Sequence, residues 1–531
     1  MTATVPSLLT DRARSRPDHP FVICDDEVLT YGDADVRSAV LAKGLLAGGV
    51  GPGTHVGLLL PNGVEATVGA LAAARIGSVA VPISTFSTPT ELATILLGAD
   101  VHTVIAANSY RSHDYVERLT EAVPGLETGR ATVVHSPALP GLRQVYFSHR
   151  DDRVCEDRTV GGLTELGRQV DDAVLQACGA AVGPADRLVI VHTSGSVAQP
   201  KGVIHQHGSL LAHLDVLNEV RRFRPEDRLF CNAPFFWIGG YGYALMGAFV
   251  AGATLICSNA EPGGVLDLLE RAKPTMCNGF VASVAALPRD PSFPGRDLSS
   301  IRRGNLYPIM APECRPVDPE LRHNMLGMTE TGSVCLASPD EGDQPEERRG
   351  SFGAPVSDVE AKVISPATGE LCGSGQVGEL CLRGAALMEG YWGRERHEVF
   401  DADGWYHTGD LFATDRGGYF YFRGRNADMI KTAGANVSPR EVEAAILGET
   451  GLVAHVIGVD DDLRGQVVAA AVRVPPGSRH PAAHDLRRQL RSRLSAYKVP
   501  QRILFLGDDE VPTMSSGKLD IRALKARFSE Q

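Results

Sequence analysis

The segment from residue 188 to 220 constrains the fold more than any other part of the chain. An apolar run, Leu188 to Val191, is typical of a buried strand. Small hydroxyl residues, Gly and a Pro-Lys-Gly sequence follow over residues 193–202, and Ser209 fits the N-cap of a helix with leucines on one face. A strand, a small-residue loop and a helix in succession can wrap a phosphate chain with backbone N–H groups, hydroxyls and Lys201. The loop does not fit the Walker pattern G-x-x-x-x-G-K-[ST].

The first 83 residues alternate between strand-like and helix-like segments. The ranges 32–47 and 65–76 have helical periodicity, and the short apolar runs 56–60 and 79–83 are strand-like. Strands that alternate with helices predict a parallel, doubly wound sheet. The fold class expected for the large N-terminal part is therefore α/β.

Composition excludes several other classes of protein. The net charge is −12 with no long run of one sign, which argues against nucleic-acid binding. The ten cysteines contain no C-x-x-C pair, so we expect reduced thiols in a cytoplasmic protein. The N-terminus has no signal-peptide pattern, and the uncharged stretch 229–260 is interrupted by Gly, Pro and Asn. We expect no membrane span there, but a buried helix followed by a strand.

Five further motifs occur at wide spacing along the chain: an aromatic run after Pro234, Leu326 to Gly332, Trp405 to Asp410, Gly424 to Glu443, and Pro512 to Lys518. Together with the loop at 193–202 they resemble, in order, the signatures of the adenylate-forming superfamily. That superfamily contains acyl- and aryl-CoA synthetases, peptide-synthetase adenylation domains and luciferases. The segment from Gly424 matches its family pattern almost position for position, and the resemblance spans nearly the whole chain.

The resemblance implies a nucleotide site for ATP, acyl-adenylate or AMP. Thr329 would contact the α-phosphate, Glu330 would hold Mg²⁺, and Asp410 would accept hydrogen bonds from the ribose hydroxyls. The expected nucleotide-binding residues are Thr193, Ser194, Gly195, Ser196, Lys201, Asn305, Leu306, Tyr307, Leu326, Gly327, Met328, Thr329, Asp410, Phe422 and Arg425.

The resemblance also implies two domains and two half-reactions. We expect an AMP- and acyl-binding domain at 1–423 and a small mobile α+β lid at 424–531. Lys518 would stabilise charge that develops on the α-phosphate as the acid attacks ATP. After the lid rotates, Lys431, Ala433 and Gly434 would line the path of the coenzyme A thiol. The expected catalytic residues are Lys518, Lys431, Thr329 and Glu330.

The expected acyl pocket contains Phe236, Trp237, Ile238 and Gly239. Many CoA ligases have His where this chain has Trp237, which predicts a bulkier and drier wall. The segment offers no carboxylate to pair with an ammonium group, and an unpaired buried charge is costly. A bulky apolar carboxylic acid is therefore the expected substrate, in preference to an amino acid.

Three departures from the family pattern concern ATP activation. Val197 and Ala198 replace Thr and Gly in the phosphate loop, Leu326 replaces an aromatic residue, and Ala427 stands at the hinge. Losing one hydroxyl bond to a phosphate costs about 1.5–3 kcal/mol. Acyl-adenylate lacks the β- and γ-phosphates, so thioesterification should be better preserved than activation. A partner adenylating ligase could then begin the reaction, as in tandem ligases of natural-product pathways.

Two other functions fit the same motifs. The first is a free-standing adenylating enzyme that loads a carrier protein instead of coenzyme A. The second is a silent pseudoenzyme that binds AMP and forms no thioester. Lys518 and Gly434, which the motifs retain, favour an active enzyme.

Overall fold

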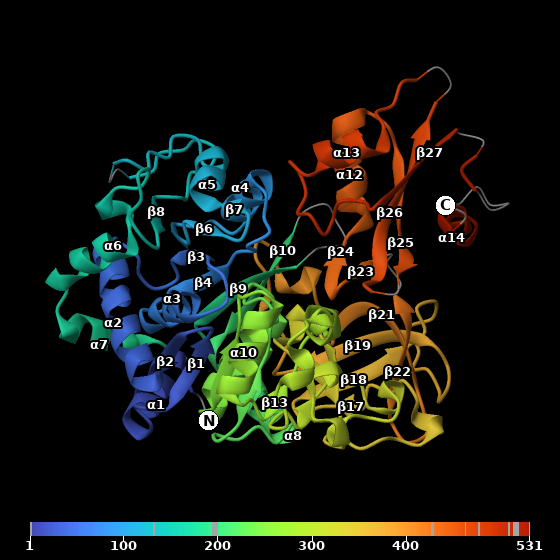
Figure 1. The fold of residues 1–531 in the computed structure, drawn as a ribbon, viewed down its shortest axis with the longest axis horizontal. Helices are drawn as coiled ribbons and strands as arrows, with labels where there is room; N and C mark the ends of the chain where they lie inside the picture. The colour runs from blue at the N-terminus through green and yellow to red at the C-terminus, as the bar shows by residue number, and fades with distance from the viewer. Residues whose placement is uncertain are drawn as a thin grey trace. The chain divides into compact units, whose positions relative to one another are not determined.

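The computed structural model divides into two compact units, shown in Figure 1. The larger unit contains Met1–Thr85, Leu96–Thr193 and Gly202–Asn426; the smaller unit contains Phe86–Ile95, Ser194–Lys201 and Ala427–Gln531. The residues described are 3–130, 133–193, 200–425, 429–461, 463–475, 478–507, 510–512 and 520–529. The long C-terminal stretch of the smaller unit thus begins three residues after the boundary expected at 424.

Two sheets form the N-terminal part of the larger unit. The first has the order β20-β10-β9-β4-β3-β5-β8, and the second has the order β14-β13-β11-β12-β1-β2. Strands β3, β4, β5 and β8 pair in parallel, as do β1, β12, β11, β13 and β14. These parallel pairings confirm the expected doubly wound α/β fold.

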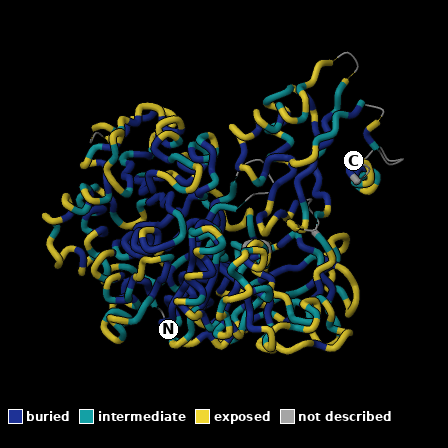
Figure 2. The backbone as a smooth tube through the Cα atoms, in the orientation of Figure 1, coloured by how far each residue is buried: buried dark blue, intermediate teal, exposed yellow. Residues whose placement is uncertain are grey.

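The strands of the two sheets are β1 (Pro20–Cys24), β2 (Glu27–Thr30), β3 (His55–Leu59), β4 (Val79–Pro82), β5 (Thr103–Ala106), β8 (Gln144–Phe147), β9 (Arg187–Thr193), β10 (Lys201–Gln206), β11 (Arg228–Phe230), β12 (Thr254–Cys257), β13 (Met276–Cys277), β14 (Arg303–Gly304) and β20 (Gly390–Tyr391). The longer helices of the unit are α1 (Val5–Ser15), α2 (Tyr31–Ala47), α3 (Val64–Arg75), α8 (His207–Val220) and α10 (Pro262–Ala272). Figure 2 shows the backbone of these strands mostly buried and the outer loops exposed.

Helix α3 lies in the interior because its sequence is almost entirely small and apolar. Ten of its residues, including every alanine, are buried, and Glu65 in the first turn is exposed. Helix α2 packs on α3 and α1. Among the described helices, none combines the length and the apolar character that crossing a membrane requires.

The region after the phosphate loop differs from the expectation. Residues Lys201–Gln206 form strand β10, which pairs antiparallel with β20 and which the sequence did not predict. Helix α8 begins at His207 with Gln206 as its N-cap, so Ser209 is not the N-cap. A short run with burial on both faces gives no periodic signal, which is why the strand was not recognised.

The apolar stretch before β12 is helical and buried, but most of it is a π-helix. Residues Gly239–Met246 form this π-helix, and α9 (Gly247–Ala251) continues it. π-Helical turns are rare and often mark functional sites. The expected helix followed by a strand is present, with a geometry that hydrophobic periodicity could not predict.

The C-terminal part of the larger unit is antiparallel. Its four-stranded sheet has the order β18-β19-β21-β22, and a three-stranded sheet has the order β15-β16-β17. Phe412 is fully buried and contacts Phe352, Phe420 and Phe422 edge-on. The strands are β15 (Leu326–Gly327), β16 (Val334–Ala337), β17 (Ala354–Pro355), β18 (Val359–Ile364), β19 (Gly378–Gly384), β21 (Tyr406–Thr414) and β22 (Phe420–Arg425).

The smaller unit is an α+β structure with its own core. Its strands are β23 (Ile430–Thr432), β24 (Ala435–Val437), β25 (Ala454–Asp461), β26 (Gly465–Val474) and β27 (Arg502–Gly507), and its helices include α12 (Pro439–Thr450), α13 (Ala483–Leu490) and α14 (Ile521–Ser529). One buried cluster joins α12 and α13 to β25 and β26 through residues such as Val442, Ile446, Leu486 and Leu490.

A buried lysine connects two segments of the smaller unit. Lys498 Nζ lies 2.7 Å from Glu91 Oε1 and 2.7 Å from Glu441 Oε1, and Lys498 is 7% exposed. Burial alone would lower the pKa of the ammonium, but Tyr497, Glu91 and Glu441 outweigh it and hold the pKa above its usual value. Removing Lys498 would leave two buried carboxylates without their shared cation.

The turn between β23 and β24 contains Ala433 and Gly434, two of the three residues expected to line the coenzyme A path. Thr432 pairs with Ala435, so Ala433 and Gly434 form a two-residue turn, and their φ values are +48° and +86°. Two positive φ values are typical of a type I′ turn, which favours Asn-Gly. Gly434 fits this geometry, whereas the Cβ of Ala433 is strained in it.

We predict that Ala433→Asn stabilises the smaller unit by about 0.5–1 kcal/mol, because asparagine tolerates the left-handed backbone better than alanine. Hydrogen exchange of the β25 and β26 amides at fixed pH measures the change. The control is Ala444→Asn on the exposed side of α12, where asparagine should destabilise by about 0.5 kcal/mol. Equal effects of both substitutions would contradict the assigned turn.

Candidate active site

The turn that carries Thr329 and Glu330 lies between β15 and β16. Residues Thr329–Thr331 form a single 3₁₀ turn, and Gly332 ends it with φ +69°. Thr331 is fully buried, and its hydroxyl contacts the carbonyl oxygens of Met328 and Ser333. This anchor leaves Thr329 and Glu330 partly exposed, as a site that receives a ligand requires.

The carboxylate of Glu330 is held by two tyrosines. The Tyr391 hydroxyl donates to Glu330 Oε1 at 2.8 Å, and the Tyr391 and Tyr406 hydroxyl oxygens are 3.0 Å apart. Burial, followed by the charge of Glu330, raises the pKa of both phenols, so both remain protonated donors. Tyr391 was not predicted from sequence, and Tyr406 was recognised only as part of the motif around Asp410.

His205 supports the same turn from the seven-stranded sheet. Its Nε2–H donates to the carbonyl oxygen of Thr329 at 2.7 Å, and the side chain is fully buried. Burial lowers the pKa of His205 to about 4. The ring is therefore neutral near pH 7, with its proton on Nε2, where the carbonyl requires a donor.

The aromatic segment lies directly against this turn. A Cβ added to Gly242 would be 2.4 Å from the carbonyl oxygen of Gly332, so only glycine permits the approach. Trp237 precedes the π-helix and packs edge-on against Phe236 and Phe280, with ring centroids 5.4 and 5.8 Å away. Phe236 and Ile238 are buried, while Trp237 and Gly239 are partly exposed. The expected acyl wall and the expected phosphate-binding turn are therefore neighbours.

Asp410 lies on β21 and is buried. Its backbone N–H donates to the Thr408 hydroxyl at 3.0 Å, and Thr408 in turn donates to the carbonyl oxygen of Leu380 at 2.7 Å. Asp410 pairs in register with Arg425 on β22, the strand that also carries Phe422. The antiparallel sheet thus brings Asp410 and the expected positions on β22 together.

The segment Asn305 to Tyr307 is more structural than expected. The Asn305 side chain exchanges hydrogen bonds with the backbone of Gly279, with both distances at 3.0 Å. Leu306 is fully buried in the core cluster that contains Ile301 and Ile309. The Leu306 side chain therefore packs inside the unit, and Tyr307 remains partly exposed.

The other expected residues are distributed over both units. Thr193 ends β9 and Lys201 begins β10, whereas Ser194, Gly195 and Ser196 between them, and Lys518, lie outside the described residues. Leu326, Gly327 and Met328 lead into the Thr329 turn. Lys431, Ala433 and Gly434 belong to the hairpin of the smaller unit, where Lys431 is exposed.

A pH-dependent stability follows from two buried histidines. Burial lowers the pKa of His205 and of His207 to about 4, and His207 Nδ1 accepts a hydrogen bond from the Val5 N–H. The unfolded chain binds these protons with a pKa of about 6.5, so stability falls as pH drops from about 6.5 to 4. The loss is on the order of 3 kcal/mol for each histidine.

Urea unfolding followed by tryptophan fluorescence tests this, because Trp237, Trp392 and Trp405 all lie in the larger unit. His205→Gln retains a donor for Thr329 and removes the titration, so its stability should vary less with pH than that of the wild type. The exposed His397, changed to Gln, is the control. The assignment is wrong if His205→Gln and His397→Gln give the same pH dependence.

The chain matches two family models, and the matches agree with the order of the motifs. A model described as AMP-binding enzyme matches residues 9–392, and a model described as AMP-binding enzyme C-terminal domain matches residues 441–518. Among solved structures, the o-succinylbenzoate CoA synthetase from Bacillus subtilis has a TM-score of 0.76 at 23% identity and covers 100% of this chain and 99% of its own. The amide bond synthetase McbA from Marinactinospora thermotolerans has a TM-score of 0.80 at 23% identity, with 99% and 100% coverage.

Curated relatives extend over nearly the whole chain. A feruloyl-CoA synthase from Amycolatopsis is 30% identical, with 97% of each chain covered. A putative acyl-CoA synthetase from Bacillus subtilis is 27% identical, with 99% of this chain and 97% of the relative covered. The AMP-binding enzyme model matches residues 9–392, which is more than half of the chain. The turn with Thr329 and Glu330 and the aromatic segment against it lie within that match. The chain is therefore an enzyme of the AMP-binding, adenylate-forming family.

Proposed function

We propose that the chain is an acyl-CoA synthetase that joins a bulky apolar carboxylic acid to coenzyme A through an acyl-adenylate and releases AMP. The observation that carries the proposal is the contact between Gly242 and Gly332, because it sets an apolar wall beside the turn with Thr329 and Glu330. Relatives named as feruloyl-CoA synthase and acyl-CoA synthetase support the reaction class. Ligases of this kind use ATP, Mg²⁺ and coenzyme A.

The residues of the site fit the activation step. Glu330 is a partly exposed carboxylate with one oxygen fixed by Tyr391, and a hard cation such as Mg²⁺ prefers oxygen ligands of this type. Bound there, Mg²⁺ would neutralise phosphate charge. Thr329 is positioned by His205 to donate to the α-phosphate, and Asp410 is the carboxylate for the ribose hydroxyls. Lys518 is the proposed cation for the charge that develops as the acid attacks.

The hairpin of the smaller unit fits the second step. In our proposal the coenzyme A thiol reaches the acyl carbon past Ala433 and Gly434, near Lys431. The thiol loses its proton to solvent, sulfur bonds to the acyl carbon, and AMP leaves with the electron pair of the broken C–O bond. The two turn residues are alanine and glycine, so the turn presents its backbone without large side chains and leaves room for a narrow thiol arm.

The apolar wall predicts the acid. Trp237→Ala should reduce kcat/KM for a bulky aryl or alicyclic acid about 10- to 100-fold, because about 1–3 kcal/mol of apolar contact is lost. A panel of such acids, short-chain acids and amino acids measures the specificity. Trp237→Phe, which keeps an aromatic ring in contact with Phe236 and Phe280, is the matched control and should lose much less. An amino acid as the best substrate would overturn the assignment.

We further propose that thioesterification outpaces ATP activation, with a partner adenylating ligase as a source of acyl-adenylate. The basis is the sequence of the phosphate loop. Val197 stands where the family pattern has a threonine with its hydroxyl, and Ala198 stands where the pattern has a glycine. Asp410, Lys431 and Gly434, which serve the adenylate and the thiol, are retained. A weaker grip on the β- and γ-phosphates affects ATP and spares acyl-adenylate.

Two assays on one preparation test this imbalance: acid-dependent pyrophosphate exchange, and thioester formation from supplied acyl-adenylate. We expect the second to be faster by about two orders of magnitude. Val197→Thr with Ala198→Gly should raise exchange and leave thioester formation unchanged. Lys518→Ala is the control that should abolish exchange and spare thioester formation. Exchange as fast as thioester formation in the wild type would refute the proposal.

The same assays separate the alternatives. A phosphopantetheinyl carrier protein replaces coenzyme A in one arm, and faster transfer to the carrier would identify a carrier-loading enzyme. AMP binding without thioester formation from any acid in the panel would identify a pseudoenzyme.

A further inference from the structure

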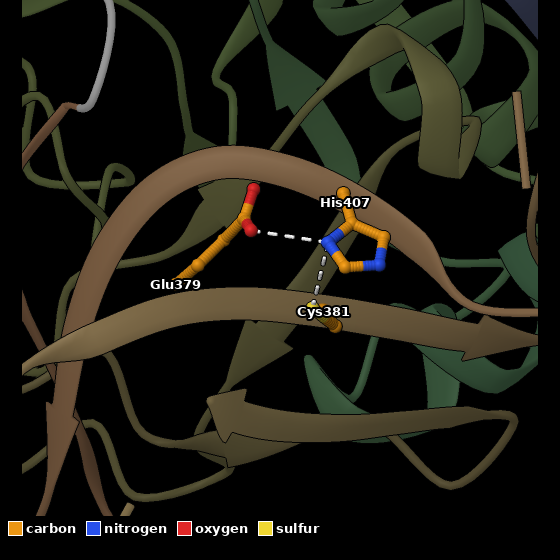
Figure 3. Close-up of side chains that lie close together, drawn as sticks. All are labelled: Glu379, Cys381 and His407. Atoms are coloured by element: carbon orange, nitrogen blue, oxygen red, sulfur yellow. Dashed lines mark hydrogen bonds and ion pairs between the residues drawn. The ribbon is translucent and has the colours of Figure 1, made fainter. Parts of the chain in front are cut away.

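A second cluster of potential metal ligands lies on the antiparallel sheet of the larger unit. Glu379 and Cys381 are on β19, and His407 is on the neighbouring β21 (Figure 3). Cys381 pairs in register with His407, and Glu379 is two residues from Cys381, so all three side chains emerge on one face of the sheet. One ligand atom from each lies within 4.8 Å of the other two.

We propose that Glu379, Cys381 and His407 bind a borderline-soft divalent cation of the zinc class. Thiolate, imidazole and carboxylate are the ligands that Zn²⁺ takes in proteins, and three of them leave a fourth position for water. Mg²⁺, the cation expected at Glu330, has little affinity for sulfur. The proposed cation is therefore chemically distinct from the one used for nucleotide chemistry.

The distances from His407 Nδ1 to the sulfur of Cys381 and to an oxygen of Glu379 fit a cation bound by all three side chains. This nitrogen lies 3.6 Å from Cys381 Sγ and 3.0 Å from Glu379 Oε2, as the dashed lines in Figure 3 mark. Zn–S and Zn–N bonds of about 2.3 and 2.05 Å separate sulfur and nitrogen by about 3.6 Å at a tetrahedral angle. The corresponding nitrogen–oxygen separation is about 3.3 Å, so Glu379 would move by only a few tenths of an ångström.

The other ring nitrogen of His407 has the partner that a metal-bound histidine usually has. His407 Nε2 lies 3.5 Å from Asp401 Oδ2. Asp401 is itself oriented, since its Oδ1 accepts hydrogen bonds from the Trp405 and Asp403 N–H groups at 2.8 and 3.0 Å. In the proposed site the Nε2–H would point at Asp401, and Nδ1 would exchange its hydrogen bond with Glu379 for the cation.

Charged groups of both signs surround the cluster. Glu379 and Asp401 are carboxylates, burial raises the pKa of the Cys381 thiol to about 12, and Lys362 pairs in register with Cys381 from β18. The Lys362 ammonium lies over the Trp405 ring, 4.2 Å from its centroid. A bound cation would displace the Cys381 proton, because the thiolate is the form that binds metal.

Glu379 connects this cluster to the segment of β21 that carries Asp410, the proposed ribose ligand. Its other oxygen, Oε1, accepts a hydrogen bond from the Gly409 N–H at 3.0 Å, and Gly409 precedes Asp410. The cation would thus fix a carboxylate that already holds the backbone beside the proposed ribose ligand.

Co²⁺ is the probe for the test, because Co²⁺ bound to a thiolate gives a sulfur-to-metal charge-transfer band in the near ultraviolet. We expect full-length protein, freed of metal by a chelator, to bind one equivalent of Co²⁺ with this band, and Zn²⁺ to displace it. Cys381→Ser should abolish the band, and His407→Ala should weaken binding at least 100-fold. Asp401→Asn should weaken it about 10- to 100-fold.

Cys178→Ser is the matched control, because Cys178 is a partly buried cysteine on α7 (Asp172–Ala181), outside the cluster. It should bind Co²⁺ as the wild type does. Circular dichroism of each variant verifies that the fold is intact, and the Asp401→Asn effect provides a second measurement if His407→Ala does not fold. A wild type without the thiolate band, or a Cys381→Ser variant with an unchanged band, would overturn the proposal.

Discussion

The close backbone approach of Gly242 to Gly332 sets the geometry of the proposed active site. One glycine belongs to a π-helix and the other ends the turn that carries Thr329 and Glu330. A side chain at position 242 would be 2.4 Å from a carbonyl oxygen, which would push the aromatic segment away from the turn. The backbone of a π-helix is wider than that of an α-helix. In this wider segment Gly242 makes the contact that places the proposed acid-binding wall beside the proposed phosphate-binding turn.

Charge in the site is controlled by burial together with directed donors. Tyr391 and Tyr406 remain phenols because their surroundings disfavour phenolate, so Glu330 always faces a donor. His205 remains neutral for the same physical reason, and its Nε2 proton holds the Thr329 carbonyl. These groups do not move protons in the proposed reaction. Their contribution is to place a threonine and a carboxylate without adding mobile charge near a triphosphate.

Much of the architecture could be predicted because its signals are local. Helices α2 and α3 and strands β3 and β4 follow from periodicity and apolar runs, and the family motifs led to Thr329, Glu330 and Asp410. Strand β10 and the π-helix could not be predicted, since short, fully buried segments have no distinctive period. Tyr391, His205 and Glu379 escaped notice because each acts through a partner distant in sequence, and only the folded sheet brings them together.

The smaller unit is not a continuous piece of chain, although the motifs assigned to the lid domain all lie in one C-terminal stretch. It includes Phe86–Ile95, which supplies Glu91 to the buried Lys498. A gene fragment cut at residue 427 would therefore encode a unit that lacks part of its own interior, with Lys498 left to Glu441 alone. For exchange of parts between related enzymes, the transferable module is the C-terminal stretch together with this short N-terminal insert. A chimera joined at the motif boundary without Phe86–Ile95 would separate Lys498 from Glu91, one of its two carboxylate partners.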